Sequence, residues 1–324
     1  MIEVHNLSKH YGSTVAVDGL DFQVLPGMVT GFLGPNGSGK STTMRCIMGL
    51  DIPSKGSATI NGQRYHGLTW PLREVGALLE ARAVHPGRSA YNHLLAMAAT
   101  NGIGKRRVTE VLELVGLEQV ARRRVGKFSL GMGQRLGMAV ALLGDPPVLL
   151  FDEPVNGLDP EGIRWVRDLL KGLAAGGRTV FVSSHLMSEM AQTADQVVVI
   201  GRGRLIANLP MAQFIDQNSR QSVRVRSPEI GRFAELLQAQ GLSVAPSDGG
   251  AIVSGAPIER VGELAAANAV TLYELSALRA SLEDVFMELT ADAVEYRPHG
   301  EDGGYAAPAP APAQVPAGSE AYPR

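Results

Sequence analysis

The stretch Gly34-Pro35-Asn36-Gly37-Ser38-Gly39-Lys40-Ser41-Thr42 decides how this chain folds. It joins an apolar segment that ends at Leu33 to a segment with the pattern of a helix. Glycines let a backbone turn so tightly that successive N–H groups point at one anion, and the following helix adds the positive end of its dipole. We expect Lys40 to reach the outer phosphates of a nucleotide and the Ser41 hydroxyl to hold Mg²⁺. The alternative, a glycine-rich surface turn, leaves the flanking strand and helix unexplained.

The composition is that of a globular protein. The chain has 324 residues, 45% of them hydrophobic and 19% charged, and this length predicts about two domains. The net charge of -2 provides no overall field that would attract nucleic acid or an anionic membrane. We interpret two short basic runs, residues 105–107 and 122–124, as solvated helix faces or ends. The single cysteine, Cys46, cannot form an intramolecular disulfide, which fits a cytosolic compartment.

No segment predicts insertion into a membrane. Residues 1–5 have neither the basic nor the apolar region of a signal peptide. The longest apolar candidate, residues 138–151, is interrupted by Gly144, Asp145, Pro146 and Pro147 and is too short to span a bilayer. We therefore expect any action on a membrane to go through a partner.

Two carboxylates follow a strand that is apolar on both faces. Residues 148–151 are Val-Leu-Leu-Phe, and Asp152 and Glu153 come next. In parallel sheets, ligands bind at the carboxyl ends of the strands. We expect Asp152 to hold Mg²⁺ indirectly and Glu153 to orient and deprotonate a water. His185 comes just after a second apolar strand, residues 179–183, and is expected at the same edge of the sheet.

Ser129 and Tyr11 each have two possible roles. Ser129 precedes a helical pattern, where it would cap the helix and could also aim the helix N-terminus at a phosphate. Tyr11 lies just before a turn at Gly12, so its ring would either pack against the protein or stack on a purine. Spacing alone leaves the two roles of Tyr11 evenly balanced.

Together these residues resemble the ATP-binding subunit of an ABC transporter over residues 1–210. The phosphate loop alone is shared by many NTPases, whereas the helix-opening motif at Ser129 is found in this family. The resemblance implies an ATPase that converts ATP and water to ADP and phosphate. It also implies a head-to-tail homodimer, in which each ATP is held by the phosphate loop of one copy and by Ser129 and Gly131 of the other.

The resemblance also implies individual roles for the site residues. His185 would contact the γ-phosphate, Tyr11 would stack on adenine, and Asp159 would communicate across the dimer interface. The implied catalytic residues are Lys40, Glu153 and His185, and the implied metal ligands are Ser41, Glu80 and Asp152. The implied ATP-binding residues are Tyr11, Gly34, Pro35, Asn36, Gly37, Ser38, Gly39, Lys40, Ser41, Thr42, Glu80, Ser129, Gly131 and Asp159.

Two departures from the usual family pattern point to a subgroup. The usual Leu-Ser-Gly-Gly-Gln is replaced by Phe128-Ser129-Leu130-Gly131-Met132, and the glutamine expected after the fifth strand is Glu80. Both resemble the subgroup that powers drug, bacitracin or daunorubicin-type exporters of the ABC-2 kind. This implies a multidrug or antibiotic-resistance exporter, with the chain peripheral at the cytoplasmic face of the membrane through a separate multi-span permease. The substrate is selected in that permease, so drug, lipid and polysaccharide export and self-resistance remain open.

The predicted fold class is α/β, a P-loop NTPase of ABC type with a mixed sheet and a helical subdomain, followed by a small α+β domain. The expected boundaries are 1–210 for the ATPase domain, about 88–145 for its helical subdomain, and 211–297 for the α+β domain, which has a split βαβ pattern. Residues 281–286 resemble the closing helix of the same exporter subgroup. The Ala/Pro-rich tail, 298–324, is expected to be disordered.

The main alternative function is a soluble, non-transport ABC ATPase that acts on ribosomes or DNA. Such chains usually carry two ATPase domains or a long coiled-coil insertion, and this sequence has neither. The charge pattern gives no nucleic-acid footprint, so no nucleic-acid partner is expected. A small-molecule phosphotransferase would have no use for the motif at Ser129.

Overall fold

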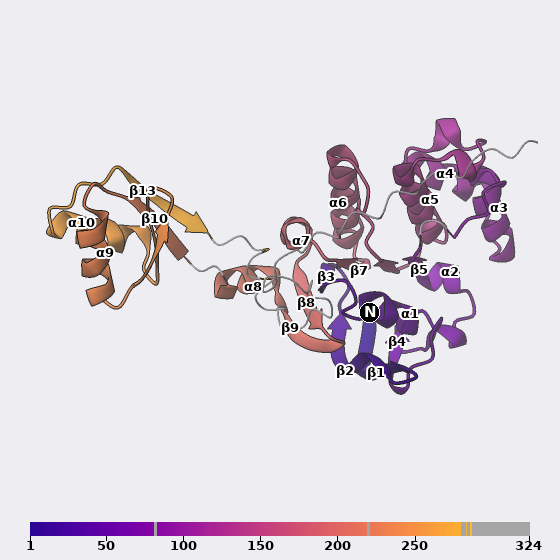
Figure 1. Cartoon of the computed structure of the whole chain (residues 1–324). Helices are drawn as coiled ribbons and strands as arrows, with labels where there is room; N and C mark the ends of the chain where they lie inside the picture. The colour runs from indigo at the N-terminus through magenta and orange to yellow at the C-terminus, as the bar shows by residue number, and fades with distance from the viewer. Residues whose placement is uncertain (81–82, 219–220, 280–282, 284–285, 287–324) are drawn as a thin grey trace, which may run out of the picture.

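The phosphate loop belongs to a six-stranded sheet with the order β5-β6-β7-β3-β8-β9 (Figure 1). The computed structural model describes residues 1–80, 83–218, 221–279, 283 and 286. The strands are β3 Val29–Leu33, β5 Val75–Leu78, β6 Val148–Phe151, β7 Thr179–Ser184, β8 Gln196–Gly201 and β9 Arg204–Pro210. All neighbours pair in parallel except β8 and β9, which are antiparallel. The mixed sheet expected from the sequence is confirmed.

Side chains that alternate along these strands build a separate core on each face of the sheet. Leu149 and Phe151 of β6 contribute to one core, whereas Val148 and Leu150 contribute to the other. Strands with both faces covered are apolar throughout, which is the pattern seen in the sequence. Figure 1 shows α3 to α7 on one side of the sheet and α1 with β1, β2 and β4 on the other.

The second core lies between the large sheet and an antiparallel sheet with the order β2-β1-β4. Its strands are β1 Ile2–Tyr11, β2 Thr14–Val24 and β4 Lys55–Ile60. Helix α1, Lys40–Ile47, contributes Met44 and Ile47 to this core. The rings of Phe22, Phe32 and Phe181 join the two sheets, with centroids 5.0 to 5.6 Å apart. Two short helices follow β4, η1 Tyr65–Gly67 and α2 Pro71–Glu74.

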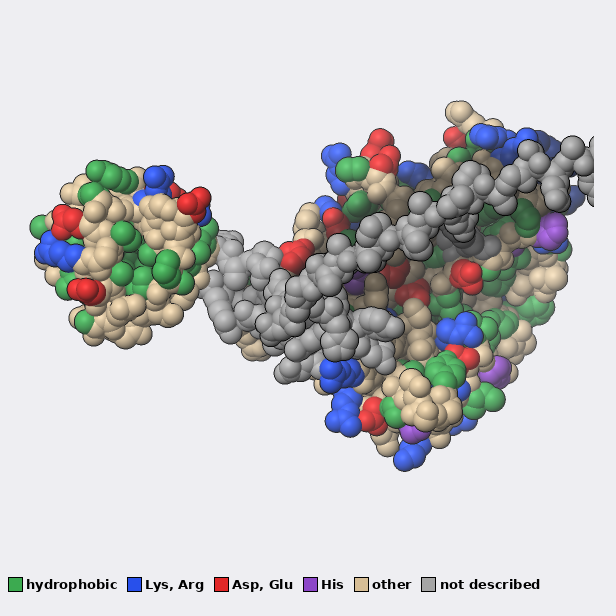
Figure 2. Space-filling model, viewed as in Figure 1, with side chains coloured by type: hydrophobic (Ala, Val, Ile, Leu, Met, Phe, Trp, Pro, Cys, Tyr) green, Lys and Arg blue, Asp and Glu red, His purple; other side chains and the backbone are tan. Residues whose placement is uncertain are grey.

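A group of helices is inserted between β5 and β6. It comprises α3 Ala90–Thr100, α4 Lys105–Leu114, η2 Glu118–Val120, η3 Val125–Lys127 and α5 Leu130–Leu142. Figure 2 shows Lys and Arg side chains gathered on the surface over this insertion. The expectation for the basic runs holds for Arg122, Arg123 and Arg124, which are exposed. It is wrong for Arg107, which is half-buried and donates to the Leu142 carbonyl at 2.8 Å near the end of α5.

Three more helices complete this part of the chain. They are α6 Pro160–Ala175, α7 Met187–Thr193 and α8 Met211–Asn218. Asp159 caps α6, and Pro160 occupies its first position, where a missing N–H costs nothing. Within the described parts of the chain, no helix has both the length and the hydropathy that a membrane span requires.

The last described elements form an antiparallel sheet with the order β11-β12-β10-β13. In chain order they are β10 Gln221–Arg226, α9 Ile230–Ala239, β11 Ser243–Ser247, β12 Gly250–Ser254, α10 Ile258–Ala267 and β13 Glu274–Arg279. Strand β12 lies between β10 and β11, which is the expected split βαβ arrangement. This sheet and its two helices enclose a third core around Phe233 and Leu237. The predicted tail, residues 298–324, and most of the segment 281–286 lie outside the described residues.

Candidate active site

The loop between β3 and α1 has the backbone that a phosphate cradle requires. Gly37 and Gly39 have φ values of +81° and +103°, in the left-handed region that favours glycine. A Cβ atom on Gly39 would lie 2.5 Å from the Ala16 carbonyl oxygen. A Cβ atom on Gly34 would clash with the Ser38 hydroxyl and lie 2.6 Å from the Ile200 carbonyl oxygen. The spacing of the glycines therefore follows from close packing of the loop against β2 and β8.

The Ser38 hydroxyl shows that this loop fits an added anion. The hydroxyl is buried and has no hydrogen-bond partner among the described residues. A buried polar group without a partner is rare and costly. A phosphate oxygen in the loop would accept this hydrogen bond, so the residues present fit a nucleotide.

Lys40 links the loop to the acidic end of β6. It is the first residue of α1 and only 6% exposed, and its ammonium donates to the carbonyl oxygens of Gly34 at 2.6 Å and Pro35 at 3.2 Å. Its Nζ lies 3.5 Å from Glu153 Oε1. Burial lowers the pKa of the Lys40 ammonium, whereas the carboxylates of Glu153 and Asp152 act in the opposite direction. The ammonium is thus positioned to donate to phosphate oxygens and to Glu153.

The two carboxylates after β6 are held by a serine of the neighbouring strand. The Ser183 hydroxyl, in β7, donates to Asp152 Oδ1 and accepts from the Glu153 backbone N–H at 2.9 Å. Glu153 has φ +48°, which is uncommon outside glycine and typical of functional sites. Sequence reasoning missed this role of Ser183. The available signal was the Ser183-Ser184 pair that interrupts an otherwise apolar strand just before His185.

His185 and Lys40 contact the same carboxylate. His185 Nδ1 lies 2.9 Å from Glu153 Oε2, while Lys40 approaches the other oxygen of Glu153. The side chains of Glu153 and His185 are 19% and 32% exposed, so they remain accessible to a small ligand. The structure therefore brings Lys40, Glu153 and His185 together. The sequence had placed these three residues at different strand ends or loops.

The metal candidates Ser41 and Asp152 do not form a complete metal site by themselves. No cluster of three or more His, Cys, Asp or Glu side chains suited to a metal ion exists among the described residues. Protein sites for Mg²⁺ commonly supply one or two ligands and leave the rest to phosphate and water. Ser41 is exposed at the start of α1, and Asp152 already accepts from Ser183. This donor set fits Mg²⁺ only together with a nucleotide.

Tyr11 lies at the end of β1 and is 47% exposed. Its hydroxyl donates to Asp51 Oδ2 at 2.7 Å, and the Lys9 ammonium lies 4.9 Å from the ring centroid. Burial raises the pKa of the Tyr11 hydroxyl, and Asp51 adds to the effect; Thr42 of the phosphate loop opposes it. The ring is therefore anchored beside the loop while half of it stays open to a planar ligand.

Ser129, Gly131 and Asp159 form a second group. Ser129 caps α5 by accepting from the Met132 N–H at 3.2 Å, and Asp159 caps α6 by accepting from the Gly162 N–H at 2.8 Å. A Cβ atom on Gly131 would lie 3.2 Å from Leu158. Within the described residues, no hydrogen bond or ion pair joins this group to Lys40, Glu153 or His185.

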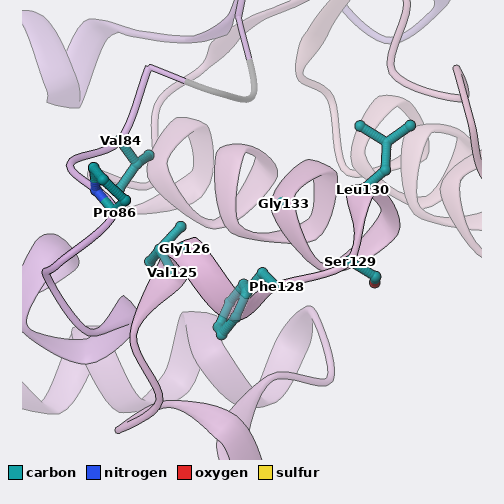
Figure 3. Close-up of a pocket in the computed structure, with 8 residues that line it drawn as sticks. All are labelled: Val84, Pro86, Val125, Gly126, Phe128, Ser129, Leu130 and Gly133. Carbon is teal, nitrogen blue, oxygen red and sulfur yellow. The ribbon is translucent and has the colours of Figure 1, made fainter. Parts of the chain in front are cut away.

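A pocket of about 280 Å³ adjoins the start of α5. Figure 3 shows its lining residues, with Ser129 and Phe128 where the chain enters the helix and Val125 on the turn before them. The described lining residues are mostly apolar, and Ser129 is the one with a side-chain hydroxyl (Figure 3). The expected capping role of Ser129 is confirmed; its predicted contact with a nucleotide stays a prediction.

Glu80 lies two residues after the end of β5 and is exposed. It lines a groove of about 350 Å³ together with Arg45 of α1, His93 and Met97 of α3, and Leu50. Among the described residues, no hydrogen bond or ion pair connects Glu80 with Ser41 or Asp152. The structure thus places Glu80 between the sheet and the helical insertion.

Comparison with known proteins identifies the family. The ABC transporter family model matches residues 17–156. An uncharacterized ABC transporter ATP-binding protein, YhcH of Bacillus subtilis (strain 168), is 36% identical over 308 residues, covering 92% of this chain and 99% of the relative. The chain belongs to the ABC transporter ATP-binding proteins. The predicted resemblance is confirmed, and this ABC ATPase binds and hydrolyses ATP.

Two further matches each cover about two thirds of the chain. The bacitracin transport ATP-binding protein BcrA of Bacillus licheniformis is 42% identical over 221 residues, covering 67% of this chain and 72% of the relative. A solved structure described as the dimeric structure of MJ0796, a bacterial ABC transporter cassette, matches with a TM-score of 0.61 and 25% identity, covering 65% of this chain and 99% of that chain. Residues 221–283 of this ABC ATPase match the model of a domain of unknown function.

Proposed function

We propose that this ABC ATPase is the energy-coupling subunit of a two-component exporter, in which two copies of the chain hydrolyse ATP and drive a separate membrane permease. The observation that carries the ATPase part is the carboxylate of Glu153, held between Lys40 and His185 beside the phosphate loop. The similarity to BcrA, whose name gives bacitracin transport, supports export of a drug or antibiotic.

ATP would be held mainly by the loop and by residues around it. The backbone N–H groups of the loop, the Ser38 hydroxyl and the Lys40 ammonium would donate to the phosphates. The Tyr11 ring would stack on adenine. Ser41 and Asp152 would hold Mg²⁺, with Glu80 as a further candidate for its water shell. Bound Mg²⁺ would neutralise negative charge on the β- and γ-phosphate oxygens.

Hydrolysis would depend on the carboxylate of Glu153. It would orient a water and accept its proton as the water oxygen bonds to the γ-phosphorus and the bond to the bridging β,γ-oxygen breaks. The contact between His185 and Glu153 Oε2 would fix the angle of this carboxylate. Ser183 would hold Glu153 and Asp152 at a constant separation, since one hydroxyl bonds to both residues.

We infer that the second group of predicted site residues acts on the ATP of a partner copy. Ser129 and Asp159 begin α5 and α6, respectively, so the positive ends of these helix dipoles would face outward from one copy. A second copy placed head to tail would present Ser129 and Gly131 to the γ-phosphate, with Asp159 at the interface. The match to a dimeric ABC cassette supports this arrangement.

The permease would lie at the groove beside Glu80. That groove contains the exposed Leu50 and joins the end of β5 to α3 of the insertion. A partner seated there would contact both the sheet that carries the ATP site and the helices that carry Ser129. We propose an ABC-2 type permease with this chain on the cytoplasmic side of the membrane, and no nucleic-acid partner.

We further propose that the chain divides into an ATPase domain over residues 1–210, with its helical subdomain at about 88–145, and an α+β domain over residues 211–297. The third core, which draws on residues from Val223 onward, supports a separate α+β unit. Met211 and Phe214 of α8 belong to the first core, so α8 packs with the ATPase domain although it follows the expected boundary at residue 210. The tail, 298–324, would add no packed structure, because it contains hardly any large aliphatic side chains.

Purification from membranes tests the proposal. The tagged chain should bring down a multi-span membrane protein encoded beside it, and ATP hydrolysis by the complex should rise when a transported drug is added. Purification of ribosomal particles or DNA fragments, with no membrane protein, would contradict export and favour a non-transport ATPase.

Substitutions of Glu80 should show whether the site needs an oxygen atom or a negative charge at this position. Glu80→Gln keeps a carbonyl oxygen at nearly the same reach, so we expect ATP hydrolysis within a few-fold of wild type. Glu80→Ala removes that oxygen and should lower hydrolysis further, and Glu80→Lys should be the most damaging because it places a cation near the metal.

Steady-state ATPase assays across a Mg²⁺ titration check this order. Glu74→Gln is the control, because Glu74 ends the short helix α2 before β5. Equal Mg²⁺ dependence for the three Glu80 variants would exclude a role for Glu80 at the metal.

A further inference from the structure

Helix α7, which follows His185, has no capping side chain from its own segment. Its N-cap residue is Leu186, whose side chain cannot accept a hydrogen bond. Instead, the Ser188 backbone N–H donates to Glu283 Oε1 at 2.9 Å, across 95 residues of sequence. A carboxylate at a helix N-terminus satisfies an otherwise unpaired donor and interacts favourably with the helix dipole. The cap of α7 is therefore supplied by a residue that follows β13 in the sequence.

A second residue from the same part of the chain returns to the ATPase core. Phe286 is 3% exposed and belongs to the same hydrophobic cluster as Met187 and Met190 of α7 and Phe214 of α8. An aromatic side chain in such a cluster is a large apolar anchor. Glu283 thus contacts α7 directly, and Phe286 packs in the core to which α7 contributes.

The position of α7 determines where His185 can lie. His185 occupies the short connection between β7, which ends at Ser184, and α7, which begins at Met187. On the β7 side, this connection is fixed by the Leu186 N–H, which donates to the Ser184 hydroxyl at 3.0 Å. The first turn of α7 is fixed by the ion pair between Glu189 and Arg167 of α6, at 3.0 Å, and by Glu283.

We propose that Glu283 is a positioning residue for His185. Its carboxylate holds the first turn of α7 and thereby keeps His185 Nδ1 at its contact with Glu153. The catalytic consequence rests on the proposed function, whereas the cap itself does not. Because β10 to β13 lie between α8 and Glu283 in the chain, the α+β unit is attached to the ATPase body at both ends.

Hydrogen exchange measured by NMR tests the cap directly and does not depend on ATP hydrolysis. In Glu283→Ala, the Ser188 and Glu189 amides should exchange roughly three- to tenfold faster than in wild type, the range typical of a lost helix cap. Glu283→Gln, which keeps an acceptor oxygen, should exchange at a rate close to wild type. Glu263→Ala is the matched control, because that glutamate is 72% exposed on α10. Unchanged protection of Ser188 in Glu283→Ala would overturn the proposal.

Kinetics test the link to His185. Glu283→Ala should lower kcat roughly three- to tenfold and leave KM for ATP unchanged, because the phosphate loop is intact. In a His185→Ala background the same substitution should have little further effect, since the two residues would act through one contact. Equal losses from Glu283→Ala in both backgrounds would show a general structural role and overturn the positioning role. If the wild-type chain had no ATPase activity, the proposed function would be overturned. The hydrogen-exchange measurement would still test whether Glu283 caps α7.

Discussion

Glu153→Gln is expected to lower ATP hydrolysis about 10²- to 10⁴-fold, the typical cost of removing a general base, while ATP binding persists. The amide has nearly the shape of the carboxylate and keeps one oxygen that can accept from Lys40 or His185. It cannot accept a proton from water near neutral pH. Phosphate contacts made by the loop and by Lys40 are unaffected, so nucleotide and water would be trapped before reaction.

A nucleotide-bound dimer of this variant should therefore accumulate. Size-exclusion chromatography with Mg-ATP should show a dimer for Glu153→Gln and a mixture that returns to monomer for wild type. Glu161→Gln is a suitable control, because Glu161 is exposed in the first turn of α6. If Glu153→Gln bound ATP but stayed monomeric, the shared sites that we propose for Ser129 and Gly131 would be wrong.

Lys40→Ala is expected to abolish useful ATP binding. The side chain is 6% exposed and is the buried cation that contacts both the loop and Glu153. Without it, the nucleotide phosphates would lose the ammonium that lies between the Gly34 carbonyl and the Glu153 carboxylate. Loss of one partner from a buried, hydrogen-bonded charge pair weakens binding by about 10²-fold or more.

Calorimetric titration with ATP measures this loss without relying on turnover. Lys171→Ala provides the control, because Lys171 is exposed on α6. An affinity of Lys40→Ala within about threefold of wild type would mean that the backbone N–H groups alone hold the phosphates. The charge argument for Lys40 would then fail.

The sequence could predict the part of the site that follows from strand ends. Asp152, Glu153 and His185 each follow an apolar strand, and parallel strands bring their carboxyl ends to one edge. The phosphate loop was predictable from the spacing of its glycines before Lys40. The structure explains that spacing, because the close approaches at Gly34 and Gly39 leave no space for a Cβ atom. The split βαβ arrangement followed from the order of strand and helix patterns after Pro210, whereas the mixed sheet was implied by the resemblance to ABC transporter ATPases.

Other features have no local signature. In the sequence, nothing distinguishes Ser183 from other serines in strands. Its hydroxyl reaches Asp152 only because of the register in which β6 and β7 pair. Arg107 belongs to a basic run that predicts a solvated surface, yet its guanidinium donates to a carbonyl group at the end of α5. The contact between Glu283 and α7 joins residues 95 positions apart, and no periodicity encodes such a distance. Tertiary packing determines all three.

The return of Phe286 to the first core has a consequence for synthesis of the protein. Residues 1–218 emerge from the ribosome well before residue 286, so the nascent ATPase part of the chain first lacks one of its buried aromatic side chains. Domains commonly begin to fold as they emerge, and apolar surface left uncovered at that stage favours aggregation. The hydrophobic cluster that contains Met187 and Phe214 would lack the Phe286 side chain until the whole α+β unit had been made. A gene fragment that stops after α8 should therefore yield poorly soluble protein, and one extended through residue 286 should not.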